Sequence, residues 1–362
     1  MIRRLALAVG DTAGHVTPAL AVAHAYASLF PQCDIRFFVA GDGAGHWLIE
    51  RAGYPVDRVP GSAFARSTKM QQAVGLLRST HGVLRARTIL RANETRLVIG
   101  TGGFGSVGAI LAAHTLGLGT ALVEPNVEPG LANRMLGRVV SRAFVAFDET
   151  ARAFPPGRAC RTGIPTPDLP SASYERRRPA LPLVKLLITT GSRGEAFFID
   201  RGPELASSLV GLGFSVRVLH QAGTHRETVA RAYQERNVDA EVLDFVTDMA
   251  AAMRDADVVV ARAGAGTIAE IAGARVPALL VPLGDAAHDH QTVNAGAMVA
   301  RGAAIAVQEP EWRSDAVAQC LVDWLSDEER WRVAVDAVGA LAAPEAAARV
   351  VEECERLMEG RW

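Results

Sequence analysis

The sequence lacks several features that would place the protein in a specialised class. Its cysteines contain no C-x-x-C pair, which argues against a disulfide framework or a zinc site and favours a reducing compartment. There are four of them: Cys33, Cys160, Cys320 and Cys354. The net charge is only -1 at pH 7, which excludes a protein that coats nucleic acid in general, and we expect no nucleic-acid partner. There is no short-period repeat and no low-complexity tract.

The chain also lacks a convincing membrane span. Its first residues, MIRRLALAVG, begin like a signal peptide, but the apolar run is short and no cleavage-like site follows. The stretch 98–123 has no formally charged residue, but it contains seven glycines and His114. A strand, a glycine turn, a helix and a second strand explain this stretch better than a membrane helix. Any membrane contact should therefore be peripheral.

The hydrophobic pattern predicts an α/β protein of two domains. A chain of 362 residues is longer than a single compact hydrophobic core accommodates. Short apolar runs alternate with amphipathic stretches throughout it. This alternation favours two doubly wound, Rossmann-like parallel sheets, with ligands beyond the carboxyl ends of the strands in a cleft between the sheets. Expected strands are Leu5–Val9, Ile35–Val39, Arg96–Ile99, Thr120–Val123, Ala143–Ala146, Val184–Thr189, Ser215–His220, Glu241–Leu243, Val258–Ala261 and Ala278–Val281. Expected helices include Pro18–Leu29, Trp47–Ala52 and Leu131–Val140.

A proline-rich segment marks the domain boundary. Seven prolines and the charged run Glu175–Arg178 lie between Phe154 and Pro182, which is typical of a linker. We place an N-terminal domain at 1–160 and a C-terminal domain at 161–340, and we expect the helix in 341–362 to pack back on the first domain. Residues 1–160 hold 17 basic and 10 acidic residues, whereas the remainder holds 21 and 29. The asymmetry indicates that the first domain faces an anionic partner, with an uneven solvated surface as the alternative.

Two glycine turns follow strands in the first half. In Gly10-Asp-Thr-Ala-Gly-His15, ahead of a helix expected near Pro18, backbone amides favour an anion and His15 could take a proton from a sugar hydroxyl. A purely structural histidine is the alternative. The second turn, Gly103-x-Gly105-x-x-Gly108, followed by Glu124, matches the dinucleotide fingerprint of an NAD-dependent dehydrogenase. That fingerprint normally lies on the opening βαβ unit, so the dehydrogenase is a minor alternative.

Turns of the same kind recur in the second half. Thr189-Thr-Gly-Ser-Arg-Gly194 offers a hydroxyl and an arginine to a diphosphate. In Arg262–Glu270, glycines let a helix begin close to phosphate, and Glu270 can accept both hydroxyls of a ribose. The polar loop 284–295 could bind a sugar, whereas its adjacent residues His288, Asp289 and His290 diverge too much for a metal site. The sequence therefore predicts a nucleotide-diphosphate site, with no metal and no cofactor.

Together these segments resemble the MurG family. They are GDTAGHVTPALAVA, TGGFGSVGAILAA, EPNVEPGLANR, TTGSRGE and RAGAGTIAEIAGARVPALLVPLGDAAHDHQTVNA, in family order along nearly the whole chain. MurG proteins are glycosyltransferases of GT-B fold that convert lipid I to lipid II in peptidoglycan synthesis. The resemblance implies inverting transfer of N-acetylglucosamine from UDP-N-acetylglucosamine to the muramoyl 4-hydroxyl of undecaprenyl-diphosphate-linked lipid I. It also implies a cytoplasmic protein, peripheral on the inner face of the bacterial plasma membrane.

The resemblance assigns expected roles to individual residues. The expected catalytic residues are His15, Asn126 and Glu124. The expected acceptor-binding residues are Thr12, Gly14, Gly103, Asn126 and Asn133. The expected donor-binding residues are Ser192, Arg193, Val246, Arg262, Gly264, Thr267, Glu270, His290, Gln291 and Asn294. Within this last set the backbone of Val246 lies in the uracil-reading segment, and Glu270 matches the ribose-binding glutamate.

Departures from the family pattern bear on the acceptor. Asp11 and Ala13 replace two glycines of the family's first loop, and a carboxylate there would repel a diphosphate. The family's arginine near the domain boundary is missing after Gly163, and Arg193 could replace its charge. A different lipid or secondary-metabolite acceptor stays open, as do a UDP-sugar 2-epimerase and an inactive UDP-sugar sensor.

A basic, partly apolar stretch lies between Phe64 and Arg91. Its basic residues are Arg66, Lys69, Arg78, Arg85, Arg87 and Arg91. Such a face could rest on an anionic membrane surface, and an ordinary solvated helix is the alternative.

Overall fold

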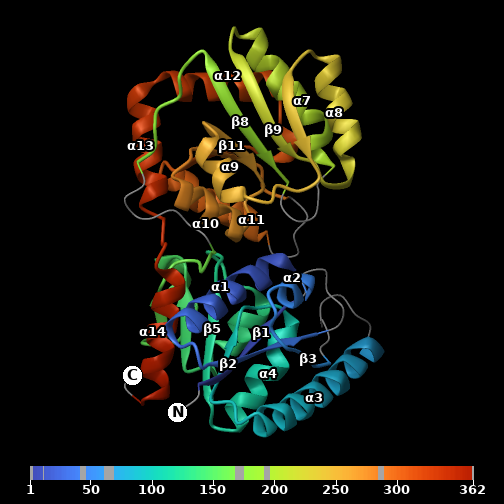
Figure 1. Cartoon of the computed structure of the whole chain (residues 1–362), viewed down its shortest axis with the longest axis vertical. Helices are drawn as coiled ribbons and strands as arrows, with labels where there is room; N and C mark the ends of the chain where they lie inside the picture. Colours follow the sequence, from blue (N-terminus) through green and yellow to red (C-terminus); the bar gives the residue numbers. More distant parts are fainter. Residues whose placement is uncertain are drawn as a thin grey trace. The chain divides into compact units, whose positions relative to one another are not determined.

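The protein, seen here as a computed structural model, consists of two compact units (Figure 1). Unit 1 comprises Met1–Pro167 and Glu345–Trp362, and unit 2 comprises Asp168–Pro344. The structure describes residues 3–10, 12–40, 46–60, 69–167, 175–190, 196–283 and 289–360, without the side chains of 13, 69–79 and 104.

Unit 1 is built on a seven-stranded parallel sheet in the order β3-β2-β1-β4-β5-β6-β7. Its strands are β1 (Arg4–Val9), β2 (Asp34–Val39), β3 (Val56–Arg58), β4 (Leu97–Gly100), β5 (Gly119–Glu124), β6 (Arg142–Val145) and β7 (Ala159–Arg161). Its helices are α1 (Ala13–Leu29), α2 (His46–Arg51), α3 (Lys69–Ala92), α4 (Phe104–Thr115), α5 (Leu131–Leu136), α6 (Asp148–Ala151) and α14 (Ala346–Met358). The order reverses between β1 and β4, so the turns after these strands diverge at the place where such sheets bind ligands.

Helices cover both faces of this sheet, and β1 shows why. Leu5, Leu7 and Val9 point into a core shared with α1 and α14, whereas Ala6 and Ala8 point into the core formed with α3 and α4. Successive side chains of a strand alternate between faces, so a strand buried on both sides becomes a continuous apolar run. That is the pattern from which β1 was predicted.

The C-terminal helix α14 belongs to unit 1. Its residues Val350, Val351 and Cys354 are buried in the core that includes α1, and α14 lies against α1 in Figure 1. At the rim of this contact, Arg3 Nε lies 2.6 Å from Glu355 Oε2. The last element of the chain therefore completes the core formed by the first.

Unit 2 is built on a six-stranded parallel sheet in the order β10-β9-β8-β11-β12-β13. Its strands are β8 (Leu183–Thr189), β9 (Ser215–Gln221), β10 (Asp239–Leu243), β11 (Val258–Ala261), β12 (Ala278–Leu280) and β13 (Ala304–Ala306). Its helices are α7 (Phe197–Gly211), α8 (Arg226–Glu235), α9 (Met249–Asp255), α10 (Ala265–Ala274), α11 (His290–Ala300), α12 (Ser314–Ser326) and α13 (Glu328–Gly339), with 3-10 turns η2 (Gly223–His225) and η3 (Glu309–Glu311). The order reverses between β8 and β11, which places the turns after these two strands at the ligand-binding position of this sheet.

The predicted doubly wound α/β class is confirmed, and every predicted strand is present with bounds shifted by at most two residues. Three strands escaped prediction, β3, β7 and β13, which are three-residue strands at sheet edges. Strands of three residues are too short to show a hydrophobic period, even where, as in β13, all of their residues are apolar.

The stretch 98–123 forms the end of β4, then α4, then most of β5, as predicted. No helix in the part of the chain that the structure describes is long and apolar enough to span a membrane.

The predicted start of the first helix near Pro18 was wrong. Helix α1 begins at Ala13, after Thr12 in extended conformation, and Pro18 lies inside it. Pro18 is the sixth residue of this helix, so its missing N–H removes the intrahelical bond that residue 18 would otherwise make to the Gly14 carbonyl. The predicted helix Leu131–Val140 is also shorter and ends at Leu136, followed by Gly137.

A pair of glycines in α7 provides a test of the packing in unit 2. A Cβ on Gly202 would lie 3.0 Å from His220 Cε1, Ile188 Cδ1 and Tyr233 Oη, whereas one on Gly211 would meet no atom within 4 Å. We expect Gly202→Ala to lower the free energy of unfolding by about 1–2 kcal/mol, because overpacking outweighs the gain in helix propensity. Gly211→Ala should be neutral or stabilising by up to about 1 kcal/mol. Urea denaturation of both variants checks this, and equal midpoints would contradict it.

Candidate active site

The turns after β1 and β4 of unit 1 meet around His15. Because α1 begins at Ala13, His15 lies in its first turn, where its Nδ1 is 3.0 Å from the hydroxyl of Thr12. The hydroxyl of Thr101, directly after β4, donates to the backbone carbonyl of His15 at 2.7 Å. Two side-chain contacts therefore fix the ring and the backbone of this histidine at the carboxyl edge of the sheet.

Close backbone approach explains the glycines of both turns. A Cβ on Gly10 would lie 2.5 Å from His15 Nδ1, and one on Gly103 would lie 2.7 Å from the Cα of Gly10. Gly103 also has a φ of 73°, a region that disfavours other residues. A Cβ on Gly105 would lie 2.4 Å from the carbonyl oxygen of Val9. The match to a dinucleotide fingerprint thus has a packing cause, since these glycines let α4 and its turn lie against β1 and His15.

Glu124 organises the segment that follows β5. It is 2% exposed, and its carboxylate accepts four hydrogen bonds. Oε1 accepts from the backbone N–H and the Nδ2 of Asn126 at 2.9 and 3.0 Å, and Oε2 accepts from the Gly130 N–H and Asn133 Nδ2 at 3.0 and 2.9 Å. Burial raises the pKa of Glu124, and the four donors partly offset this effect. The carboxylate acts as the centre of a folded loop.

Asn133 links this loop to the turn after β4. Its Nδ2 also donates to the Val123 carbonyl at 3.2 Å, and it lies 3.4 Å from the position that a Cβ on Gly102 would take. Its Oδ1 is buried and accepts no hydrogen bond from the residues that the structure describes. Buried acceptors are rarely left unsatisfied, so this oxygen marks a position for a hydroxyl or a water.

The structure thus gathers the residues expected to act on the acceptor side at one edge of unit 1. Thr12, His15 and Gly103 contact one another directly or through Gly10. Asn126 and Asn133 join them through Glu124 and Gly102. Gly14 is exposed on the first turn of α1, beside Thr12, and Asp11 lies outside the described residues.

In unit 2 the turn after β11 leads into α10 without a side-chain cap. Gly264 precedes the helix, and Thr267 is half-buried in its first turn. A Cβ on Gly266 would meet no atom within 4 Å, and one on Gly264 would meet only the Thr267 hydroxyl, at 3.8 Å. The hydroxyl of Thr267 has no hydrogen-bond partner among the described residues. Unpaired amides at a helix start favour an anion such as a phosphate.

Glu270 lies further along the same helix. It accepts no hydrogen bond from any residue in the described ranges, and burial raises its pKa to about 7. A carboxylate without donors in a partly buried position is destabilised until a ligand supplies them. Two neighbouring hydroxyls of a sugar are the kind of donor that would do so.

Arg262 is committed to contacts inside unit 2. It is 4% exposed, donates to the carbonyls of Val281 and Pro282 at 3.1 and 3.4 Å, and pairs with Glu309 Oε1 at 2.5 Å. The rings of Phe197 and Phe198 each lie 5.2 Å from its guanidinium carbon. Arg262 therefore connects the segment after β12 with the start of α7 through non-covalent contacts.

Two residues of α11 also hold the ends of neighbouring strands. Gln291 Oε1 accepts from the Leu283 N–H at 3.0 Å, and Asn294 Nδ2 donates to the Ala263 carbonyl at 3.2 Å. Asn294 is buried, whereas Gln291 and His290 are half-buried at the start of the helix. These contacts bring α11 to the same edge of the sheet as Gly264 and Glu270. Direct binding of the sugar nucleotide by His290, Gln291 and Asn294 stays a prediction.

Val246 lies between β10 and α9 and is buried, whereas the preceding Phe245 is 59% exposed. The Val246 N–H donates to Gln221 Oε1 at 3.0 Å. Ser192 and Arg193, the predicted diphosphate contacts, lie outside the described residues. Among the described residues, no group of three histidine, cysteine or acidic side chains is arranged to hold a metal ion.

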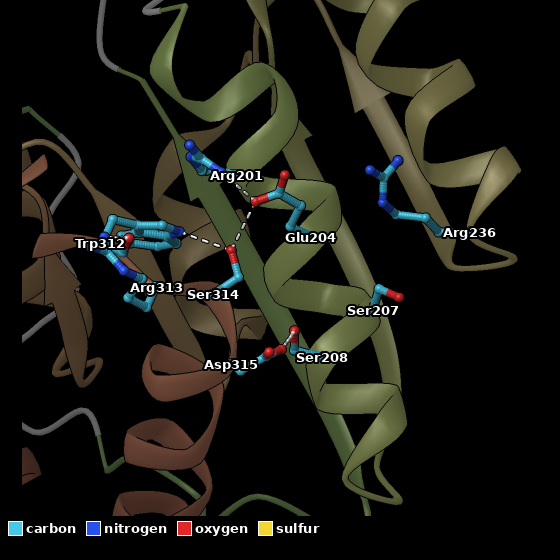
Figure 2. Close-up of a pocket in the computed structure, with 9 residues that line it drawn as sticks. All are labelled: Arg201, Glu204, Ser207, Ser208, Arg236, Trp312, Arg313, Ser314 and Asp315. Carbon is cyan, nitrogen blue, oxygen red and sulfur yellow. Dashed lines mark hydrogen bonds and ion pairs between the residues drawn. The ribbon is translucent and has the colours of Figure 1, made fainter. Parts of the chain in front are cut away.

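A polar pocket of about 490 Å³ lies on unit 2 between α7 and the start of α12 (Figure 2). Its polar groups largely satisfy one another. Glu204 Oε2 accepts from Arg201 at 2.7 Å and from Ser314 at 3.0 Å, while Ser208 donates to Asp315 at 2.6 Å. The pocket contains none of the predicted donor-binding residues, and its contacts anchor α12 on α7.

Sequence reasoning missed Thr101 and Gly102 in unit 1 and Gln221 in unit 2. All three lie at or directly after the carboxyl end of a strand. A polar residue at that position was the available signal for Thr101 and Gln221, because strand ends in parallel sheets face the ligand. For Gly102 the signal was weaker, since one glycine in a glycine-rich turn does not stand out.

Comparison with known proteins identifies the family. Residues 5–145 match the glycosyltransferase family 28 N-terminal domain, and residues 185–350 match its C-terminal domain. A relative from Nitratidesulfovibrio vulgaris is 37% identical over 99% of this chain and 98% of its own. One from Anaeromyxobacter dehalogenans is 33% identical over 99% of this chain and 94% of its own. Both are named UDP-N-acetylglucosamine–N-acetylmuramyl-(pentapeptide) pyrophosphoryl-undecaprenol N-acetylglucosamine transferase.

A solved structure gives the same result. The crystal structure of Acinetobacter baumannii MurG is 26% identical in sequence and superposes with a TM-score of 0.81. The match covers 98% of this chain and 99% of that one, which confirms the predicted GT-B fold. With both family 28 domains in order and relatives above 30% identity along its whole length, the chain belongs to the MurG family of glycosyltransferases.

Proposed function

We propose that the protein transfers N-acetylglucosamine from UDP-N-acetylglucosamine to the muramoyl 4-hydroxyl of lipid I, forming lipid II with inversion at the anomeric carbon. The observation that carries this proposal is full-length similarity, at 33–37% identity, to transferases named for that reaction. The two sites described above supply the parts that the reaction needs, an acceptor side in unit 1 and a nucleotide-sugar side in unit 2.

The donor side is the carboxyl edge of the unit 2 sheet. Glu270 accepts both ribose hydroxyls, which supplies the hydrogen bonds that its buried carboxylate lacks. The first turn of α10, with Gly264 and Thr267, binds the diphosphate together with Ser192 and Arg193. Val246 lies beside the uracil, and His290 and Gln291 face the sugar.

The acceptor side is the edge of unit 1 around His15. The Thr12 hydroxyl lies 3.0 Å from His15 Nδ1 and so orients the ring, and we assign Nε2 as the nitrogen that takes the proton of the acceptor hydroxyl. Glu124 is a positioning residue, since all of its hydrogen bonds hold the loop that carries Asn126 and Gly130 and the helix α5 that carries Asn133. The buried Oδ1 of Asn133 accepts from the acceptor.

Fixed dipoles and the Arg193 side chain stabilise the departing UDP in this proposal. Negative charge develops on the diphosphate, and amides at the start of α10 already point at that position without reorganisation. We therefore expect no metal requirement.

A peripheral position on an anionic membrane completes the proposal. In the described part of α3, Leu84 is 60% exposed, and Arg85 and Arg91 of the same helix are also exposed. Basic and apolar groups on one helix favour the surface of anionic lipid, where the acceptor resides.

The first experiment measures UDP release from UDP-N-acetylglucosamine in EDTA, with a short-chain lipid I analogue and with lipid I in anionic vesicles. We expect release that depends on the acceptor and yields a β-linked disaccharide, and in vesicles a rate that falls as salt rises. Donor binding without release would contradict this acceptor and direct attention to Asp11, whose reversion to glycine would then be tested. Activity restored only by a divalent metal would contradict the proposed leaving-group stabilisation.

We expect Glu270→Gln to weaken donor binding but to raise the stability of the protein. Glu270→Gln should weaken UDP-N-acetylglucosamine binding at pH 8 about tenfold or more, because charged hydrogen bonds to the ribose are lost. The pKa of Glu270 is raised to about 7, so the folded protein must ionise a group that resists ionisation, and this lowers stability as pH rises from about 4.5 through 7. The variant should therefore melt at a higher temperature than the parent at pH 8.

The pH dependence supplies the control for Glu270. Donor affinity of the parent protein should fall about tenfold per unit below pH 7 as the carboxylate is protonated, and this dependence should be absent in Glu270→Gln. Calorimetric titration with the diphosphate sugar checks both proteins, since the sugar diphosphate itself does not titrate in this range. A parallel pH dependence in both would contradict the assignment.

We expect the loss of His15 to lower turnover without affecting donor binding. His15→Ala should lower kcat by about 10²- to 10⁴-fold, the usual loss for a general base, while the Kd for UDP-N-acetylglucosamine stays within about twofold. Thr12→Val keeps the histidine but removes its Nδ1 partner, so a smaller loss of kcat is expected. Equal loss of donor affinity in His15→Ala and Glu270→Gln would contradict this division of roles.

A further inference from the structure

Thr150 connects two segments at the carboxyl edge of the unit 1 sheet. It lies in α6, which follows β6, and it is 1% exposed. Its hydroxyl donates to the backbone carbonyl of Asn126 at 3.0 Å and to that of Val127 at 2.9 Å. A hydroxyl carries one hydrogen, so the two carbonyls share it in a bifurcated bond. One buried side chain therefore holds the segment that follows β5.

The sheet brings these two segments together. β5 and β6 are parallel neighbours, in a register that pairs Glu124 with Val145. The carboxyl ends of adjacent parallel strands lie at the same edge, where such sheets bind ligands. Thr150 and Asn126 are 24 positions apart in the sequence, so their contact forms only when β5 and β6 have paired.

The backbone of Asn126 is held on both sides. Its N–H donates to Glu124 Oε1 at 2.9 Å, and its carbonyl accepts from the Thr150 hydroxyl at 3.0 Å. Its side-chain Nδ2 donates to the same Glu124 oxygen at 3.0 Å. Backbone dihedrals determine which side-chain rotamers are allowed, so the direction of the Asn126 side chain depends on Thr150 as well as on Glu124.

Packing alone does not require a hydroxyl at position 150. Valine has nearly the same shape as threonine and would fill the space without a polar atom, whose burial is costly. The burial of Thr150 also keeps its side chain from reaching a substrate. The polar group at this position therefore serves the two carbonyls that it contacts.

We propose that Thr150 is a positioning residue for the acceptor, which it orients through Asn126. The inference rests on the proposed function, because it takes Asn126 to contact the acceptor. In the parent protein the shared hydrogen bond keeps the segment 126–127 in one conformation before the acceptor arrives. Binding of the acceptor then does not have to order this segment, which lowers the cost of association.

Loss of the hydroxyl should weaken acceptor binding and leave the donor side unchanged. Thr150→Val keeps the shape of the side chain and removes the donor to both carbonyls. We expect the KM for a short-chain lipid I analogue, measured at saturating UDP-N-acetylglucosamine, to rise about threefold to tenfold. The kcat and the Kd for UDP-N-acetylglucosamine should stay within about twofold. Thr150→Ser retains the hydroxyl and should restore the parent KM.

A double-mutant cycle tests whether Thr150 acts through Asn126. Asn126→Ala should itself raise the KM for the acceptor, and adding Thr150→Val to it should raise the KM little further, because the two residues act on the same contact. Equal factors in both backgrounds would contradict this route. If Thr150→Val does not fold, Thr150→Cys, whose thiol is a weaker donor, should show a smaller rise of the same kind.

A matched control lies in β5 itself. Thr120 is also 1% exposed, and its hydroxyl accepts from the Ser141 N–H at 3.1 Å, near the opposite end of the strand. Thr120→Val should lower the melting temperature yet keep the parent KM for the acceptor. A parent-like KM in Thr150→Val, or an equal rise in Thr120→Val, would overturn the inference while acceptor-dependent UDP release persists. A parent protein that releases no UDP with this acceptor would overturn the proposed function itself.

Discussion

The close approach of two backbone turns in unit 1 is the constraint on which its site depends. The Cα of Gly10 lies where a side chain on Gly103 would have to be, and His15 occupies the remaining space. The approach is possible because β1 and β4 are neighbours in the sheet and the chain turns away from them in opposite directions. A Cβ at either glycine would separate the turns and displace the imidazole. The position of the His15 ring therefore depends on the absence of a Cβ at Gly10 and at Gly103.

Buried polar side chains fix the conformation of segments that follow the strands. Glu124, Arg262 and Gln221 are each at most 4% exposed, and each holds the backbone of a segment that follows a strand. Segments at strand ends have few partners of their own, because the sheet stops and the helix has not begun. A buried carboxylate, guanidinium or amide with several hydrogen bonds gives such a segment one conformation, at an energetic cost that an apolar residue would not carry.

Glu270 shows the opposite arrangement. Its carboxylate is partly buried in a helix with no donor among the described residues, which lowers the stability of the free protein above its pKa of about 7. Arg262 and Glu124 each have several partners within the protein, whereas Glu270 has none among the described residues. Unsatisfied polar groups at a ligand-binding edge are typical of sites that a substrate completes, and on this ground we propose Glu270 as a ligand-binding residue.

The sequence by itself determined the alternation of strands and helices, both parallel sheets and the family. Apolar runs such as Leu5–Val9 record burial on both faces, and glycine turns after strands mark the ligand-binding edges. It did not determine where α1 begins, because the extended Thr12 and the packing of Gly10 on Gly103 decide that start. Nor could it separate the roles of Arg262, Glu124 and Glu270, since a charged residue near a glycine turn looks the same whether its partners are protein or ligand. Only the tertiary structure decided this, because the partners of Arg262 and Glu124 come from segments that folding brings together, whereas Glu270 has none among the described residues.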